Sequence, residues 1–348
     1  MVILKGEHEV KRKVMIGLLM APVLVGLSTG MASASLTAPE ILNQFNLVVF
    51  GDATSSSHVD GRAYVGGSLT GGIYVSHPGD TPASDYAGLT VGGGASGVMV
   101  NDDGAVIGGS LSNSTINSGA AAVFGSASYN NFNGPAYVAG AQVGNNFNGG
   151  TDSSLATGTA AQAATSTDFP SVLTELSNQL MNLSSTGSTV TINGSKATFN
   201  AVADSNGVAV FNLSDADLLA GEFDFNLNGA TTIILNSGDD VISISANFLG
   251  GLARLIGATT IWNFYNATSV TISSEFGGSI LAPLADFTNY NNIEGGVYVN
   301  TLHQYGEIHL QPFTGEIPTS TVPVPPAALL LGSALAGLAP LRKKFRAA

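Results

Sequence analysis

The sequence predicts a mainly β protein whose short parallel strands stack into a right-handed β-helix, with one α-helix along its flank. The first observation is a unit of apolar strand residues followed by glycines, Ala-Tyr-Val-Gly-Gly-Ser-Leu at 63–69, which recurs as Val-Ile-Gly-Gly-Ser-Leu at 106–111. A second unit, Asn-Asn-Phe-Asn-Gly, occupies 130–134 and again 145–149. A repeated short strand and turn is typical of solenoids, in which each coil buries its apolar side against its neighbours. Glycine suits the corners, because it tolerates positive φ and a close approach of backbones.

The composition agrees with this class and leaves one alternative. The chain has 44 glycines in 348 residues and only 10% charged residues, and small uncharged side chains suit closely stacked coils. The alternative is a β-sandwich in which Asn-Gly and Ser-Gly pairs form hairpin turns. These pairs are Asn193-Gly194, Asn206-Gly207, Asn228-Gly229 and Ser237-Gly238.

Residues 1–34 have the pattern of a secretory signal peptide with an N-terminal signal helix. A basic triplet at 11–13 precedes an apolar stretch at 14–27, and the small residues Ala32-Ser33-Ala34 follow. This order directs export, so we expect the Sec machinery to translocate the chain and signal peptidase to cut between Ala34 and Ser35. A translation start at Val10 is an alternative hypothesis, because acidic residues precede it. Detection of a product that begins at Met1 would exclude that start.

The body, residues 35–317, opens with an amphipathic segment at 38–49 and continues into the glycine-punctuated strands. One helix is expected near 168–184, because Asp168 is a suitable N-cap, Pro170 stands in the first turn, and apolar residues follow at helical spacing. Its single apolar stripe predicts that it covers a flank of the β-body. Further strands, rich in β-branched residues, are expected at 189–192, 231–235, 241–244, 259–262 and 269–272.

Residues 318–348 have the pattern of a membrane-sorting tail. The motif Val322-Pro323-Val324-Pro325-Pro326 precedes an apolar run at 327–341, and the basic cluster Arg342, Lys343, Lys344 and Arg346 follows. A helix over this run spans about 22 Å, short of the roughly 30 Å hydrocarbon core, and predicts a short transmembrane helix. The basic cluster would stay cytoplasmic, which leaves the body outside the membrane in agreement with export.

This tail resembles the PEP-CTERM protein-sorting signal of Gram-negative bacteria, which combines a proline motif, a short apolar span and a terminal basic cluster. The resemblance implies that an exosortase-type membrane protease cuts at the motif. Val324 stands where the name-giving glutamate of the family would be, so the motif matches the Val-Pro-x-Pro-Ala variants. A permanent tail anchor is the alternative.

Charge is distributed unevenly along the chain. Eight of the eleven Lys and Arg residues lie in the two terminal segments, so the body holds only Arg62, Lys196 and Arg254 against 22 of the 24 acidic residues. A body this anionic cannot neutralise phosphates, which excludes nucleic acid as a partner. The chain has no cysteine, so an exported fold cannot rely on disulfides.

Candidate chemical groups in the body are few. Asp102-Asp103 and Asp239-Asp240 are acid pairs that a β-helical glycan hydrolase could use, or that could bind Ca²⁺. Each pair adjoins a glycine, as ordinary turn aspartates do. We therefore assign no catalytic, cofactor-binding or metal-binding residue.

Other reactive residue types also lack the spacing that function requires. His58, His77, His303 and His309 do not form a zinc motif, and Ser195 lacks a nucleophile elbow. Trp262 sits in an apolar strand and is expected in the core. An ice-binding face would need regular Thr-x-Thr ladders at coil spacing, and the sequence does not contain them.

Both ends of the body resemble the choice-of-anchor A domain family. The opening match runs over 46–52 and 59–69, and the closing match over 262–272, 278–283, 295–299, 306–309 and 312–315. This family is similar to ice-binding-type β-helices with a flanking helix, occurs on bacterial surfaces, and implies an adhesive role without catalytic residues.

The sequence therefore predicts an exported, non-enzymatic protein at the Gram-negative cell surface or in the extracellular matrix, held by its C-terminal anchor before processing. The expected role is adhesion or association with exopolysaccharide, or another surface ligand, in a biofilm. The alternatives are a hydrolase of neutral glycans and a calcium-dependent structural module.

Overall fold

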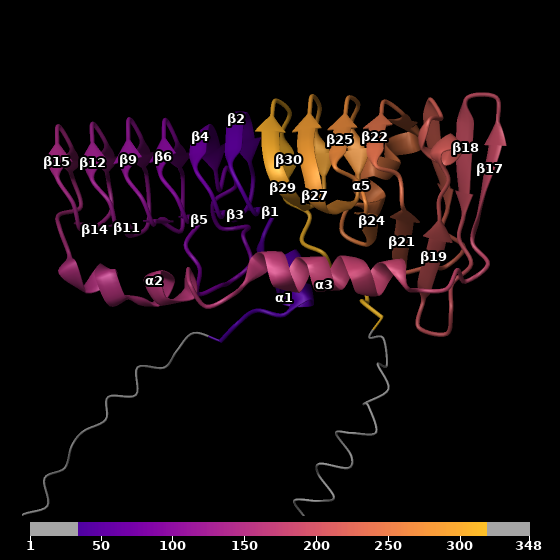
Figure 1. The fold of residues 1–348 in the computed structure, drawn as a ribbon, viewed down its shortest axis with the longest axis horizontal. Helices are drawn as coiled ribbons and strands as arrows, with labels where there is room; N and C mark the ends of the chain where they lie inside the picture. Colours follow the sequence, from indigo (N-terminus) through magenta and orange to yellow (C-terminus); the bar gives the residue numbers. More distant parts are fainter. Residues whose placement is uncertain (1–33, 319–348) are drawn as a thin grey trace, which may run out of the picture. The chain divides into compact units, whose positions relative to one another are not determined.

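The computed structural model describes residues 34–318, which form a stack of parallel coils whose strands line three faces (Figure 1). In spatial order, the first face consists of β19 (Val208–Asn212), β21 (Thr232–Ser237), β24 (Thr260–Phe264), the start of β27 (Ser279–Asn289), the start of β29 (Val297–Gln304), β1 (Leu47–Val49), β3 (Ala63–Val65), β5 (Leu89–Val91), β8 (Ala105–Ile107), β11 (Ala121–Val123) and β14 (Ala136–Val138).

The second face follows the same order. It consists of β22 (Val241–Ile244), β25 (Ser269–Ile272), the ends of β27 and β29, the start of β2 (Ala53–Val59), the start of β4 (Leu69–Tyr74), β6 (Ala95–Ser96), β9 (Leu111–Ser112), β12 (Ala127–Ser128) and β15 (Gln142–Val143). The third face consists of β26 (Phe276–Gly277), β28 (Ile293–Glu294), β30 (Ile308–His309), the ends of β2 and β4, β7 (Met99–Val100), β10 (Thr115–Ile116), β13 (Asn131–Phe132) and β16 (Asn146–Phe147).

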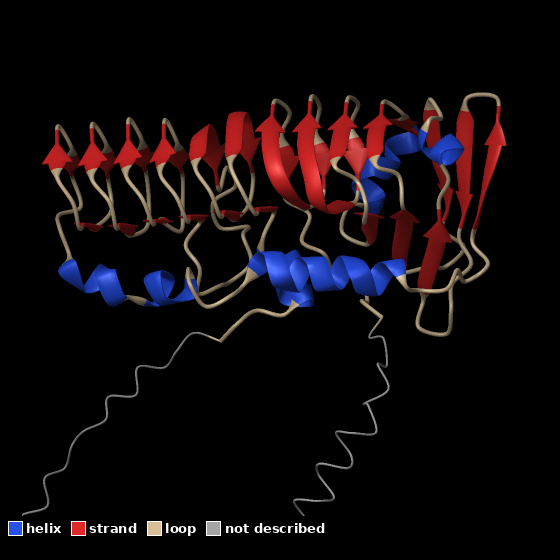
Figure 2. Cartoon of the chain, viewed as in Figure 1, coloured by secondary structure: helices blue, strands red, loops and turns tan. Residues whose placement is uncertain are grey.

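The helices lie along the first face (Figure 2). The helices on this face are α1 (Ala38–Gln44), the 3₁₀ helix η1 (Ser153–Thr157), α2 (Thr159–Ala163) and α3 (Phe169–Met181). Three other short helices lie within the later coils: α4 (Asp215–Leu218), η2 (Leu249–Gly251) and α5 (Leu252–Ile256). Because helices cover the first face, β5, β8 and β11 are buried on both sides, whereas β9 and β12 bury only every other residue. This confirms the predicted β-helix with a covered flank.

The order of the coils differs from the order of the chain. β1 lies in the middle of the stack and pairs with β3 on one side and with β29 on the other, so that Leu47 adjoins both Ala63 and Val297. The chain runs from β1 outward to β16, passes back along the first face through α3, and returns from the opposite end of the stack to β29 and β30 (Figure 1). The first and last coils therefore meet at a junction inside the stack.

Helix α3 confirms the predicted helix and bridges this junction. Its N-cap Asp168 accepts a hydrogen bond from the Ser171 amide at 3.1 Å, and Phe169 stacks on Tyr64 of β3 with ring centroids 4.1 Å apart. Its later turns dock on the returning coils, where buried Asn263 donates to the Ser177 carbonyl at 3.0 Å and Asn236 donates to the Leu180 carbonyl at 2.8 Å. One helix thus holds both halves of the stack.

The sequence repeats occupy equivalent positions in successive coils. Phe132 and Phe147 of the two Asn-Asn-Phe-Asn-Gly units stack with ring centroids 5.1 Å apart, and Asn148 donates to Asn133 Oδ1 at 2.8 Å. In the Gly-Gly-Ser units, a Cβ on Gly108 would lie 2.3 Å from the carbonyl oxygen of Gly92 in the next coil. Close approach of backbones, rather than positive φ, therefore requires glycine at this corner.

A second, four-stranded sheet follows α3. It consists of β17 (Thr189–Asn193), β18 (Lys196–Asn200), β20 (Glu222–Asn226) and β23 (Asn247–Phe248). Only the β17–β18 pair is antiparallel within the described residues, and its turn contains the Asn193-Gly194 pair of the sandwich alternative. The remaining strands pair in parallel, so the sandwich is not formed. Trp262 is fully buried among phenylalanines of this region, which confirms it as a core residue.

Candidate functional site

A continuous row of polar side chains, eight hydroxyls and one histidine, runs along the second face. In each coil an apolar residue such as Leu111 points into the core, so the residue that follows it in the strand points outward. The strand register places these outward residues side by side in neighbouring coils. We call them the hydroxyl row: Ser243, Thr271, Thr288, His303, Thr54, Thr70, Ser96, Ser112 and Ser128.

The hydroxyl row depends on the junction for its continuity. His303 of β29 and Thr54 of β2 are neighbours across the junction, with Thr54 Oγ1 3.1 Å from His303 Nδ1. All members of the row are exposed or half-buried. Neighbouring strands lie about 4.8 Å apart, so the row presents hydrogen-bonding groups at a constant spacing over the length of the stack.

The chemistry of the row is neutral. Serine and threonine hydroxyls both donate and accept hydrogen bonds, and His303 is the only titratable member. Asp286 lies beside the row, where it accepts a hydrogen bond from Thr301 Oγ1 at 2.8 Å and lies 3.5 Å from His303 Nε2. A row of uncharged hydrogen-bonding groups of this kind suits a polymer with repeating hydroxyl groups.

Sequence reasoning did not detect this row. Each coil contributes one member, the members mix serine, threonine and histidine, and four of the nine come from the later part of the chain. A search for Thr-x-Thr therefore could not detect it. A usable signal was present in the Gly-Gly-Ser-Leu units at 66–69 and 108–111, because Thr70 and Ser112 each directly follow the inward leucine of their unit.

The first acid pair stands at a corner of the stack. Asp103 has positive φ and forms an ion pair with Arg62, whose Nη2 lies 2.9 Å from Asp103 Oδ2. Asp102 accepts a hydrogen bond from Ser118 Oγ at 2.9 Å. Both carboxylates thus hold neighbouring turns, as turn aspartates do.

The second acid pair lies beside the short helix α4. Burial and the nearby Asp215 carboxyl raise the pKa of Asp239, which accepts a hydrogen bond from Ser237 Oγ at 2.7 Å. Asp240 accepts one from Thr268 Oγ1 at 2.8 Å. Asp239 and Asp240 therefore have different partners and do not converge on one point. Ser195 lies in the turn before β18, where its carbonyl accepts the Gly221 amide at 2.8 Å.

Three of the four histidines within residues 34–318 come together, contrary to the sequence expectation. His58 and Asp60 at the end of β2 lie beside Glu307 and His309 of the last coil, and His77 and Glu294 adjoin them. We call these six residues the junction cluster. The signal that could have found it is the alternation of His58-Val59-Asp60 and Glu307-Ile308-His309, in which one buried residue separates two outward ones. No local feature shows that the two segments are neighbours.

The export and sorting signals fall largely outside the described residues. Ala34 and Ser35, which flank the predicted cleavage bond, are exposed at the start of the described chain. Ala32, the motif Val322-Pro323-Val324-Pro325-Pro326 and the basic cluster at 342–346 lie beyond it. Within residues 34–318, no helix combines the length and the apolar character needed to cross a membrane.

Comparison with known proteins gives one match. The family model described as "Putative Ice-binding-like adhesive domain" matches residues 38–310, which is most of the chain. Neither the curated proteins nor the solved structures contain a match.

Proposed function

Because the chain belongs to the ice-binding-like adhesive domain family, we propose that it is an exported surface adhesin whose hydroxyl row binds neutral exopolysaccharide. The observation that carries the proposal is the continuous row of outward polar side chains from Ser243 to Ser128, eight hydroxyls and His303, across the junction. A repeating polymer can meet many such groups at once, so weak individual hydrogen bonds add up to firm attachment.

Charge favours a neutral polysaccharide over an acidic one. The body holds three basic residues against 22 acidic ones. Of the three, Arg62 is buried, and Lys196 and Arg254 are paired with Asp224 and Glu294. An anionic polymer would find no lysine or arginine along the hydroxyl row and would be repelled by Asp286 beside it.

Binding by the hydroxyl row is tested with bulky substitutions. In the double variant Ser96→Tyr/Ser112→Tyr, two large rings interrupt the row without changing its charge. We expect retention on the insoluble exopolysaccharide of the producing bacterium to fall at least about tenfold, equivalent to about 1.4 kcal/mol. The matched control is Asn178→Tyr on the exposed side of α3. Equal retention of the double variant and the wild type would refute the proposal.

The proposal includes no catalysis. Asp102, Asp103 and Asp240 are each engaged by a neighbouring Ser, Arg or Thr side chain, which supports a structural role for them. An adhesive role needs only a surface, and incubation of the protein with the bound polysaccharide should release no soluble sugar. Release of reducing ends that is lost in Asp239→Asn would favour the hydrolase alternative.

The proposed route to the surface uses both termini. The Sec machinery and signal peptidase would process the exposed bond between Ala34 and Ser35, and an exosortase-type protease would act at 322–326. The support for the second step is the order of proline motif, apolar run and basic cluster in the tail. Fractionation of cells with and without residues 322–348 tests this. An unchanged surface fraction after the deletion would refute exosortase sorting.

A further inference from the structure

Three potential metal ligands, His58, Glu307 and His309, meet where the first coil joins the last, and Asp60 adjoins them. Val59 of β2 pairs with Ile308 of β30, and both point into the core. The residues on either side of them therefore point outward, which brings His58 beside Glu307 and Asp60 beside His309. Ligand atoms of His58, Glu307 and His309 all lie within 4.8 Å of one another.

The separations between these atoms suit a small ion with tetrahedral geometry, three of whose ligands the cluster would supply. His58 Nε2 lies 3.5 Å from Glu307 Oε2 and 3.5 Å from Asp60 Oδ1, and His309 Nε2 lies 2.8 Å from Glu307 Oε2. Tetrahedral ligands at about 2.0–2.1 Å from a zinc ion are about 3.3 Å apart. An ion at the centre thus requires shifts of only a few tenths of an ångström at each of these pairs.

Asp60 provides a second, independent indication of a cation-binding position. Its side chain is 3% exposed, and Oδ2 accepts a hydrogen bond from the Leu310 amide at 3.2 Å. Oδ1 is buried and has no hydrogen-bond partner among the described residues, since His58 Nε2 and His77 Nε2 stay at 3.5 and 3.7 Å. A buried carboxylate oxygen without a donor is costly, and a bound cation would satisfy it.

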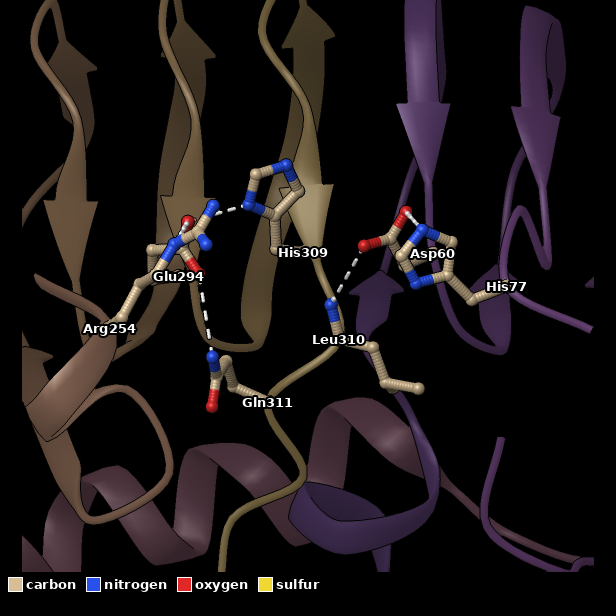
Figure 3. Close-up of a pocket in the computed structure, with 7 residues that line it drawn as sticks. All are labelled: Asp60, His77, Arg254, Glu294, His309, Leu310 and Gln311. Atoms are coloured by element: carbon tan, nitrogen blue, oxygen red, sulfur yellow. Dashed lines mark hydrogen bonds and ion pairs between the residues drawn. The ribbon is translucent and has the colours of Figure 1, made fainter. Parts of the chain in front are cut away.

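The surroundings orient His309 as metal sites orient their histidines. His309 Nδ1 lies 2.6 Å from Oε1 of the buried Glu294, which Arg254 and Gln311 also contact (Figure 3). A carboxylate on Nδ1 fixes the ring and directs Nε2 toward Glu307 Oε2, the other ligand atom that an ion would contact. These residues line a pocket of about 240 Å³, with Asp60 and His77 on its other side (Figure 3).

We propose that the junction cluster binds one divalent transition-metal ion of the zinc class through His58, Glu307 and His309, beside the buried Asp60 carboxylate. Two imidazoles and a carboxylate favour Zn²⁺ over Ca²⁺, which takes oxygen ligands. Because His58 and Asp60 belong to the first coil and Glu307 and His309 to the last, the ion would fasten the junction on which the hydroxyl row depends. This inference does not rest on the polysaccharide proposal.

The test is a titration of the untagged full-length protein, freed of metal with a chelator, with Zn²⁺ alone. We expect calorimetry to give one saturable site per chain, and Zn²⁺ to raise the thermal midpoint because it binds only the folded junction. His58→Asn and Glu307→Gln should each weaken binding at least about tenfold, as loss of even a supporting residue does in known sites.

The matched control is His303→Asn, which removes a histidine from the hydroxyl row outside the cluster. It should bind Zn²⁺ as the wild type does, and far-UV circular dichroism should show that all variants are folded. The proposal is overturned if the wild type shows no saturable binding, or if His58→Asn and Glu307→Gln bind as tightly as the wild type. Equal affinity for Ca²⁺ would also overturn it.

Discussion

Replacing Arg62 with methionine is predicted to destabilise the fold by about 3–5 kcal/mol. Arg62 is 2% exposed although it carries a full charge. Its guanidinium donates to the carbonyls of Gln44, Pro82, Tyr86 and Ala87 and to Asp103 Oδ2. Methionine keeps most of the apolar stem but leaves these acceptors unpaired, and each buried orphan costs about 1–3 kcal/mol. The loss of stability should lie at the lower end of this range of about 3–5 kcal/mol, because Asp103 is 41% exposed and water can solvate it.

Urea denaturation measures this cost against a matched control. Lys196→Met also removes one cation, but the Lys196–Asp224 pair is 37% and 30% exposed and contributes at most about 1 kcal/mol. We expect the unfolding midpoint to fall several times further in Arg62→Met than in Lys196→Met, with the same slope in both. Equal midpoints in the two variants would refute the role assigned to Arg62.

Two further substitutions test the corners and the docking of α3. Gly108→Ala should destabilise the stack by about 1–3 kcal/mol in urea denaturation, because its Cβ would lie 2.3 Å from the Gly92 carbonyl oxygen. Gly94→Ala should destabilise it less in the same assay, because the nearest atom to its Cβ would lie 3.2 Å away. Similar costs for the two would argue against coil spacing as the cause. Asn263→Ala should destabilise the fold by about 2–3 kcal/mol, because it leaves the hydroxyl and the carbonyl of Ser177 unpaired. Hydrogen exchange in this variant should accelerate in α3 before it does in β11. Uniform acceleration would contradict a docking role for Asn263.

The elements of the fold were predictable because their signals are local. The Gly-Gly-Ser corners repeat with the coils, and Asp168 and Pro170 mark the start of α3 in the sequence itself. Burial of the second-face strand residues follows from the alternation of apolar and polar residues along β9 and β12. These features need no knowledge of which coil lies next to which.

The candidate sites were not predictable because they depend on the order of coils. The hydroxyl row requires that His303 lie beside Thr54, and the junction cluster requires that Ile308 lie beside Val59. Both pairings join residues about 250 positions apart. A parallel coil can stack on any coil of similar register, so nothing in the sequence of β2 identifies β30 as its neighbour.

The central claim, that the hydroxyl row binds polysaccharide, is tested most directly by nuclear magnetic resonance. The isotope-labelled protein is titrated with soluble oligosaccharides of the exopolysaccharide, and amide shifts are mapped on the three faces. We predict that the largest shifts occur at Ser96, Ser112 and Ser128 and across the junction at Thr54. Shifts confined to the first face, or to Asn117 and Asn133 beyond the strands of the third, would contradict the claim.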